Sequence, residues 1–179
     1  LARLYGHQKG IESPAIIVME QAFHGRTLAT LSATGNRKVQ AGFEPLVSGF
    51  VRVPFNSIET VRQVAAQNAN VVAVLVEPIQ GEGGLRPPAA GVAGYLEALR
   101  TICDRHDLLL MLDEIQTGNG RTGKYFAFQH SAMVAVNSRL NFEGVFDHHP
   151  RLGMPQLTCI PDLPTTFSIK RSTCASGNG

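Results

Sequence analysis

Three groups of polar residues in this sequence could perform chemistry, and each follows a short apolar run. Residues 23–27 (FHGRT) follow the run at 15–20, residues 77–84 (EPIQGEGG) follow Val71–Val76, and residues 113–118 (DEIQTG) follow the run at 108–112. Carboxylates, an amide, a guanidinium and closely spaced glycines therefore occur at corresponding places. If the runs are neighbouring parallel strands, their carboxyl ends meet at one sheet edge, where such folds bind ligands. One shared site is the economical interpretation.

Each residue also has a simpler explanation when it is taken alone. An aspartate after an apolar run often caps a turn, glutamates between glycines are often solvated, and closely spaced glycines can merely supply positive φ. Phenylalanine is more often a core residue, arginine a surface residue and histidine a packing residue. These alternatives apply to Phe23, His24, Arg26, Glu77, Glu82, Asp113 and Gly81, Gly83 and Gly84.

Short apolar runs alternate with amphipathic stretches, and this alternation predicts the elements that would position the polar groups. Strands followed by helices predict right-handed βαβ units and a largely parallel sheet. An antiparallel α+β domain remains the alternative fold class. The predicted strands are residues 15–20, 50–55, 71–76 and 108–113, and the predicted helices are residues 25–33, 56–67 and 89–106.

Three local signals refine these elements. Asn56 with Glu59 three residues later has the form of a capping box, which predicts the start of a helix. Residues 1–6 have the pattern of a final helical turn that closes on Gly6, so we expect a further segment before Leu1. Helical spacing in residues 89–106 predicts one apolar stripe. Its members are Val92, Tyr95, Leu96, Leu99, Ile102 and Cys103.

Composition excludes several classes of protein. The 179 residues are 44% hydrophobic and carry a formal charge of +2, which argues against disorder and against a dedicated nucleic-acid binder. The apolar runs are far shorter than the roughly 18 residues that cross a bilayer, and no secretory signal is visible. Three widely spaced cysteines do not form a disulfide framework, so a reducing cytoplasm is the predicted compartment.

Other chemistries have weaker support in the sequence. Residues 108–114 resemble the magnesium-binding strand of an ATPase, but that interpretation requires a G-x-x-x-x-G-K-[ST] loop, which does not occur. Neither Cys103 with His106 nor the pair at 148–149 with Cys159 has convincing zinc spacing. No G-x-S-x-G motif supports a serine hydrolase. We therefore predict no metal site.

Three longer motifs carry a family resemblance. Residues 23–27 (FHGRT), 76–84 (VEPIQGEGG) and 112–123 (LDEIQTGNGRTG), in this order, closely resemble the class III, fold-type I pyridoxal-phosphate aminotransferases. The resemblance covers residues 1 to about 130, and residues 28–45 look most like the bacterial acetylornithine aminotransferases. It implies an α/β fragment of the large domain, with a mostly parallel sheet and flanking helices. Ornithine and 4-aminobutyrate aminotransferases share much of the remainder.

The resemblance implies a role for each of five residues. Asp113 would bind the pyridine nitrogen of pyridoxal phosphate, Gln116 its phenolic oxygen, and Phe23 would stack on the ring. Arg26 would bind the substrate α-carboxylate in bidentate fashion. Glu82 would be the family's switch acid, which holds a second arginine when no dicarboxylate is bound.

Two parts of the family pattern are missing from their usual places. The phosphate-binding Gly-Thr loop would precede Leu1. The lysine that binds the cofactor covalently should follow Asp113 by about thirty residues, but residues 140–144 (LNFEG) contain none. Lys170, after Pro161-Asp162, is the remaining candidate catalytic residue. We predict that residues 131–179 are an aberrant, poorly ordered segment from a frameshift or insertion, which leaves sheet edges uncovered.

By this resemblance, the parent enzyme transfers an amino group from N-acetylornithine, or a related ω-amino donor, to 2-oxoglutarate. It would be a cytoplasmic homodimer of arginine biosynthesis that binds neither nucleic acid nor membranes. The alternatives are a catalytically inactive fragment, an ornithine or 4-aminobutyrate aminotransferase and, more distantly, an ATPase-like domain.

Overall fold

The described part of the chain folds around one β-sheet. The computed structural model describes residues 1–82, 84–131 and 157–159. Four parallel strands stand in the order β2-β1-β3-β4, and β5 pairs with β4 in the antiparallel direction. The parallel pairs confirm the predicted α/β class over the antiparallel alternative. The strands are β1 (Ala15–Met19), β2 (Phe50–Val53), β3 (Val71–Val76), β4 (Leu109–Asp113) and β5 (Leu157–Cys159).

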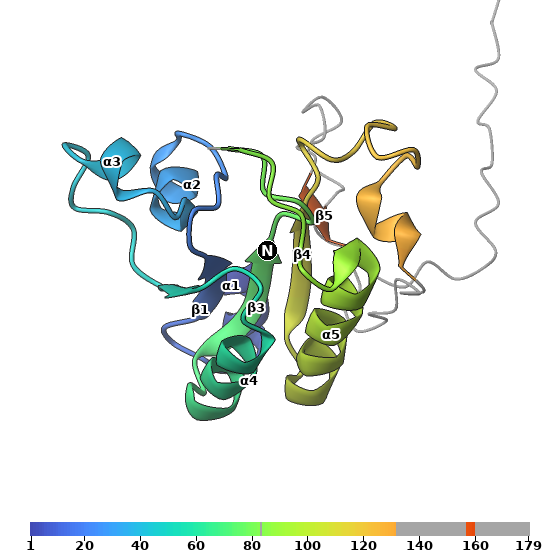
Figure 1. Cartoon of the computed structure of the whole chain (residues 1–179). Helices are drawn as coiled ribbons and strands as arrows, with labels where there is room; N and C mark the ends of the chain where they lie inside the picture. Colours follow the sequence, from blue (N-terminus) through green and yellow to red (C-terminus); the bar gives the residue numbers. More distant parts are fainter. Residues whose placement is uncertain (83, 132–156, 160–179) are drawn as a thin grey trace, which may run out of the picture.

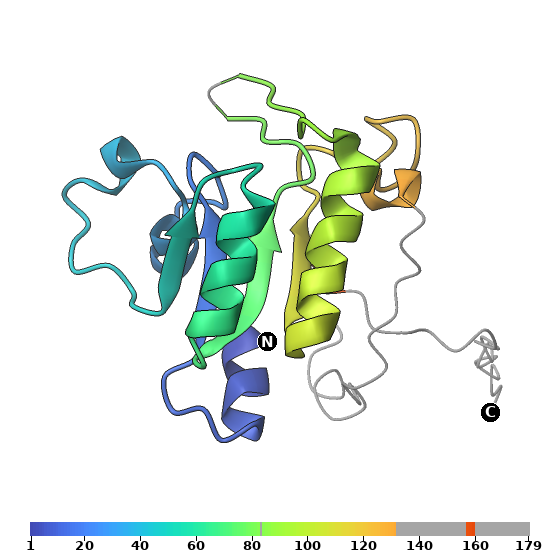
Figure 2. The same cartoon turned by 60° about the horizontal axis from the view of Figure 1, so that its bottom comes forward.

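Helices cover both faces of this sheet. The longer helices α4 and α5 lie together on one face, and α1 lies on the other (Figures 1 and 2). The short α2 and α3 follow β1 and lie beyond the end of the sheet (Figure 1). The helices are α1 (Ala2–Gln8), α2 (Leu28–Ala33), α3 (Arg37–Gln40), α4 (Ile58–Gln67), α5 (Gly91–His106) and the 3-10 turn η1 (Ala127–His130).

Burial on both faces explains why the strands are continuous apolar runs. Side chains alternate along β1: Ile17 and Met19 pack with the α4 and α5 side, whereas Ile16 and Val18 pack with the α1 side. All residues of β1, β3 and β4 are buried. A strand covered by helices on both faces has no polar alternation, because neither face meets water.

The predicted apolar stripe of α5 is confirmed. Tyr95, Leu96, Leu99, Ile102 and Cys103 are buried against the sheet, and Val92 packs at their margin.

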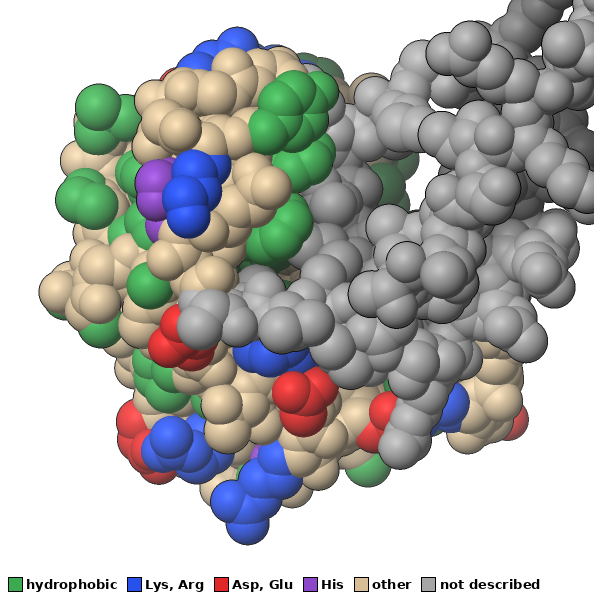
Figure 3. Space-filling view, turned by 90° about the vertical axis from the view of Figure 1, so that its right-hand side faces the viewer, with side chains coloured by type: hydrophobic (Ala, Val, Ile, Leu, Met, Phe, Trp, Pro, Cys, Tyr) green, Lys and Arg blue, Asp and Glu red, His purple; other side chains and the backbone are tan. Residues whose placement is uncertain are grey.

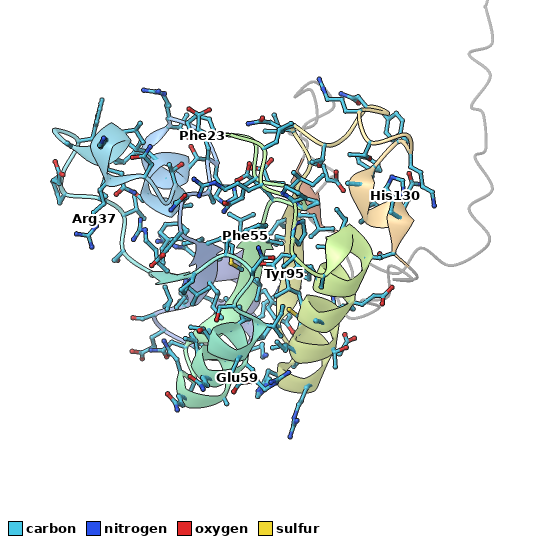
Figure 4. All side chains as sticks on the ribbon, viewed as in Figure 1. Phe23, Arg37, Phe55, Glu59, Tyr95 and His130 are labelled. Atoms are coloured by element: carbon cyan, nitrogen blue, oxygen red, sulfur yellow. The ribbon has the colours of Figure 1, made fainter. Side chains whose placement is uncertain are left out.

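Tyr95 lies between helix and sheet, close to Phe55 (Figure 4). Its ring meets that of Phe55 edge to face with 5.2 Å between centroids, and its hydroxyl donates to the sulfur of Met19 at 3.6 Å. Burial raises the pKa of the Cys103 thiol to about 12. Cys103 is therefore a small hydrophobic residue of the core and not a reactive thiol.

Two local predictions were wrong in detail. Gly6 does not end the first helix but lies inside α1, where a Cβ atom would stand 2.6 Å from the Pro14 ring. The left-handed glycine after this helix is Gly10, with φ of 76°. Asn56 also forms no capping box, since its Oδ1 accepts the backbone N–H of Ala89 at 3.1 Å. Long-range packing decided both features.

The predicted uncovered sheet edge is also corrected. β3 is an interior strand between β1 and β4, and β5 covers the far side of β4. Met111, Leu112 and Asp113 pair with residues 159, 158 and 157, respectively. The predicted disorder of residues 131–179 concerns positions that, apart from residue 131 and β5, lie outside the described residues.

The described surface carries both signs of charge. Acidic and basic side chains are intermixed over the lower part of the face in Figure 3, and apolar side chains gather above them. On α5, Arg100 and Asp104 form an ion pair at 2.7 Å. None of the described helices has the length and hydrophobicity needed to cross a membrane.

Candidate active site

The loops after β1, β3 and β4 meet at one end of the sheet, as the sequence predicts. The backbone N–H of Phe23, after β1, donates to Oε2 of Glu77, after β3, at 3.1 Å. The side chain of His24, next to Phe23, donates to Asp113 at the end of β4. Figure 4 shows Phe23 at this end of the molecule, near the loop that leaves β3. The shared-site interpretation is therefore supported by contacts between segments 54 and 89 residues apart.

Asp113 is a buried carboxylate held from two sides. Its Oδ2 accepts from Nδ1 of His24 at 2.8 Å, and its Oδ1 accepts from the backbone N–H of Ile115 at 3.2 Å. Both side chains of the His24–Asp113 pair are almost fully buried. A carboxylate has no proton to donate, so Nδ1 of His24 is the donor in this contact, and the two contacts give the Asp113 side chain a fixed orientation. The remaining lone pairs of Asp113 can accept from a bound cation.

His24 is itself held by the loop that contains it. Its backbone N–H donates to Oγ1 of Thr34 at 3.0 Å, and that hydroxyl donates in turn to the Thr30 carbonyl at 3.0 Å. Nε2 of His24 is buried, with no hydrogen-bond partner among the described residues. The interpretation of His24 as a packing histidine alone is incomplete, because its ring orients the key carboxylate.

Glu77 is buried as well, so the solvated-acid alternative is wrong for this residue. Its exposed fraction is 3%. Burial raises the pKa of the Glu77 carboxyl, as the Asp113 charge does to a smaller extent, while the backbone N–H groups of Phe23 and Gly81 and the His24 ring oppose the shift. The solvated-acid description still fits Glu82, which is exposed in the same loop.

Gln116 lies directly against Gly81. A Cβ atom at Gly81 would stand 1.9 Å from Oε1 of Gln116, so a larger residue here would displace the end of the exposed Gln116 side chain. The glycine therefore serves close packing here, whereas Gly84 has a φ of 111° and supplies positive φ as the alternative proposed. The close approach brings the loop after β4 against the loop after β3.

Phe23 and Arg26 lie together at the rim of this site. The Phe23 side chain is half-buried, and the guanidinium carbon of exposed Arg26 lies 5.9 Å from the centroid of its ring. Glu82 contacts none of Phe23, Asp113 or Gln116 in the described hydrogen bonds and ion pairs. Lys170 lies outside the described residues. The structure thus gathers Phe23, Arg26, Asp113 and Gln116 at one end of the sheet, with Glu82 in the adjoining loop.

Glu114 is a buried acid that sequence reasoning left without a role. Its Oε2 accepts the Thr117 hydroxyl and the backbone N–H of Ala127 at 3.0 Å, and its Oε1 accepts that of Phe128 at 3.0 Å. Its side chain is fully buried. Glu114 therefore fixes η1 to the end of β4, whereas the neighbouring Asp113 is the carboxylate of the candidate site.

The arrangement suits a flat, cationic heterocycle. The buried carboxylate of Asp113 lies at the end of the sheet, and a half-buried aromatic ring is present on Phe23. The side chain of Ile115, directly beside Asp113, is 52% exposed and adds apolar surface. A protonated ring nitrogen would find its counter-charge in Asp113, while ring faces would find apolar partners. A pyridinium ring has these properties.

Comparison with known proteins gives the same family as the sequence motifs. Residues 1–136 match the family described as aminotransferase class-III. The acetylornithine aminotransferase of Nitrosomonas europaea is 63% identical over 134 residues, which are 75% of this chain and 33% of that protein. That of Agrobacterium fabrum is 51% identical over 134 residues, 74% of this chain and 32% of that protein. The chain thus spans about a third of the length of these relatives.

Solved structures agree with the sequence matches. The ornithine aminotransferase of Toxoplasma gondii superposes with a TM-score of 0.69 at 32% identity, covering 74% of this chain and 31% of that one. The N-acetylornithine aminotransferase of Stenotrophomonas maltophilia gives 0.56 at 34% identity, covering 74% and 30%. These similarities exclude the ATPase-like alternative and confirm that the sheet is part of a larger aminotransferase fold. The chain belongs to the class III aminotransferases, a family that uses pyridoxal phosphate.

Proposed function

We propose that the complete enzyme transfers an amino group from N-acetylornithine to 2-oxoglutarate with pyridoxal phosphate as cofactor. The observation that carries this proposal is the buried Asp113 carboxylate, oriented by His24 at the carboxyl end of β4. A neutral or exposed residue there would not hold a protonated ring nitrogen. The two acetylornithine aminotransferases with 63% and 51% identity support the choice of donor.

Each of the gathered residues has a task in this proposal. When bound, pyridoxal phosphate would supply an electron sink for the pair left when the C–H bond breaks at the carbon that carries the transferred amino group. Asp113 binds the ring nitrogen and holds its proton, so the ring keeps its positive charge. Gln116, whose exposed amide lies against Gly81, donates to the phenolic oxygen. Phe23 covers a ring face and excludes water from it.

Two charged residues are assigned to the substrate. Arg26 is exposed at the rim next to Phe23, where its planar guanidinium can bind an α-carboxylate through two parallel hydrogen bonds. Glu82, in the loop after β3, is proposed to pair with a second arginine elsewhere in the complete enzyme when the bound substrate has no second carboxylate. These assignments let one site accept both an ω-amino donor and a dicarboxylate acceptor.

Ornithine and 4-aminobutyrate are the competing donors. The Toxoplasma gondii structure, named an ornithine aminotransferase, has the higher TM-score but only 32% sequence identity. Because side chains at the rim decide between donors, the higher sequence identity favours N-acetylornithine. The proposal also makes the complete enzyme a cytoplasmic homodimer of arginine biosynthesis.

The proposal is tested in a full-length protein, called here the hybrid enzyme. It carries residues 1–130 of this chain in place of the matching segment of the Nitrosomonas europaea acetylornithine aminotransferase. We expect glutamate formation from 2-oxoglutarate with N-acetylornithine, at a higher kcat/KM than with ornithine or 4-aminobutyrate. A preference for either competing donor would overturn the assignment. An inactive hybrid with a folded site would favour the inactive-fragment alternative.

The 179-residue chain alone is expected to form no stable covalent adduct with pyridoxal phosphate. We propose that residues 131–179 do not contribute the family's lysine in its usual place. The measurement is a visible spectrum after cofactor addition and removal of the excess, followed by borohydride trapping and peptide mapping. A stoichiometric adduct mapped to Lys170 would contradict the prediction and make that residue part of the site.

Replacing Arg26 with lysine is expected to raise the donor KM of the hybrid enzyme about 10-fold and to leave cofactor affinity nearly unchanged. Lysine retains the charge but loses the bidentate contact, a difference of roughly 1–2 kcal/mol. Donor KM and the cofactor Kd are measured separately. Arg37→Lys, at an exposed position of α3, is the matched control. Unchanged donor kinetics would show that Arg26 does not bind the carboxylate.

A further inference from the structure

The Glu77 carboxylate joins its own loop, after β3, to the loop after β1, and the roles proposed above do not use this connection. Its Oε2 accepts the backbone N–H of Phe23 at 3.1 Å, and the backbone amide of Gly81 also acts to lower the pKa of the carboxyl. Burying a carboxylate costs desolvation free energy, of which two amide donors recover a part. Burial is not a general property of acids in this loop, because Glu82, five residues after Glu77, is exposed.

We infer that Glu77 is a positioning residue of the cofactor site, whose carboxylate fixes the loop of Phe23 against the loop of Gly81. This inference rests on the proposed function, because Phe23 and Gln116 are the residues assigned to the ring. Glu77 acts through these two residues and does not itself contact the cofactor.

The contact at Gly81 extends the effect of Glu77 to a third loop. Oε1 of Gln116 occupies the space that a Cβ atom at Gly81 would fill. A displaced Gly81 would therefore change the position of the Gln116 amide. Glu77 also accepts the backbone N–H of Phe23, and the next residue, His24, binds Asp113. One buried carboxylate thus links the three loops that bring Phe23, Gln116 and Asp113 together.

Within the described part of the chain, His24 and Asp113 are the titratable groups that act on Glu77. Burial and the Asp113 charge raise the pKa of Glu77, and the His24 ring opposes them. A carboxyl whose pKa is raised by folding stabilises the fold most below its unfolded value, and this contribution is lost as pH rises through the folded pKa. Ionising the Glu77 carboxyl therefore costs stability, which is the pattern expected when position matters more than stability.

The first test follows the two amides directly in the 179-residue chain. Backbone amide chemical shifts of Phe23 and Gly81 are recorded by NMR between pH 4 and 8. Both are expected to titrate together with a midpoint above the ordinary glutamate value of 4.5. In Glu77→Gln this shared titration is expected to disappear, whereas Glu20→Gln, an exposed acid at the end of β1, leaves it unchanged. Amide shifts that do not respond to Glu77→Gln would overturn the inference.

The second test separates positioning from general stability in the hybrid enzyme. Glu77→Gln is expected to raise the Kd of pyridoxal phosphate about 10-fold, as for a lost charge-assisted hydrogen bond. At saturating cofactor the donor KM is expected to change less than twofold, because Arg26 remains in place. The urea midpoint of the variant relative to wild type should rise with pH, because the substitution removes a carboxyl of raised pKa. An unchanged cofactor Kd would contradict a positioning role.

The two proposals fail in different ways. A hybrid enzyme with unaltered residues that does not transaminate would overturn the proposed function, while the amide titration of the 179-residue chain would still report on Glu77. Conversely, an active hybrid whose cofactor affinity is indifferent to Glu77→Gln would retain the function and lose the positioning role.

Discussion

Replacing Asp113 with asparagine is expected to lower kcat of the hybrid enzyme by on the order of 100-fold or more, with little effect on folding. Asparagine has the same shape and can still accept from His24, but it carries no negative charge. The ring nitrogen then loses the counter-charge that holds its proton, and electron withdrawal by the ring weakens. Single-turnover kinetics with N-acetylornithine measure the loss in the chemical step itself.

A control substitution on α5 tests whether the loss of a carboxylate outside the site affects catalysis. Asp104→Asn removes an exposed carboxylate that pairs with Arg100 at 2.7 Å, so it should leave both kcat and the cofactor spectrum unchanged. A His24→Phe variant should reduce kcat less than Asp113→Asn, since the carboxylate remains but is no longer oriented. If the Asp113→Asn enzyme kept near wild-type turnover, Asp113 would not be the partner of the ring nitrogen.

Replacing Glu114 with alanine is expected to destabilise the chain by about 3–5 kcal/mol, the largest stability effect that we predict. The substitution leaves the backbone N–H groups of Ala127 and Phe128 and the hydroxyl of Thr117 without their acceptor. Each buried donor without a partner costs roughly 1–3 kcal/mol. Urea denaturation of the 179-residue chain measures the loss as a lower midpoint with an unchanged slope.

The geometry also predicts where the structure loosens first. Hydrogen exchange at Ala127 and Phe128 should accelerate in Glu114→Ala, while amides of β1 exchange as in the wild type until global unfolding. Glu114→Gln, which retains one acceptor oxygen, should lose about half as much stability. Glu59→Ala, on the exposed side of α4, serves as the surface control. A Glu114→Ala chain within about 1 kcal/mol of wild type would show that the anchor is dispensable.

Features that depend on neighbours in the chain were predicted well. Continuous apolar runs located β1, β3 and β4 to within one residue at each end, because strands buried on both faces need apolar side chains at every position. The stripe on α5 followed from helical periodicity. Local signals misled where long-range packing intervened: Asn56 binds Ala89 instead of capping α4, and Gly6 packs on Pro14 inside α1.

In the candidate site, too, local features were predictable from the sequence and long-range contacts were not. The sequence by itself determined the types and order of the polar residues at three strand ends, and with them the family. Only the tertiary structure decided which acids are buried and what they bind: Glu77 holds Phe23, Glu114 holds η1, and His24 orients Asp113. The physical reason is that a side chain's partner depends on which strands become neighbours. Contacts across 54 or 89 residues leave no periodic trace in the sequence.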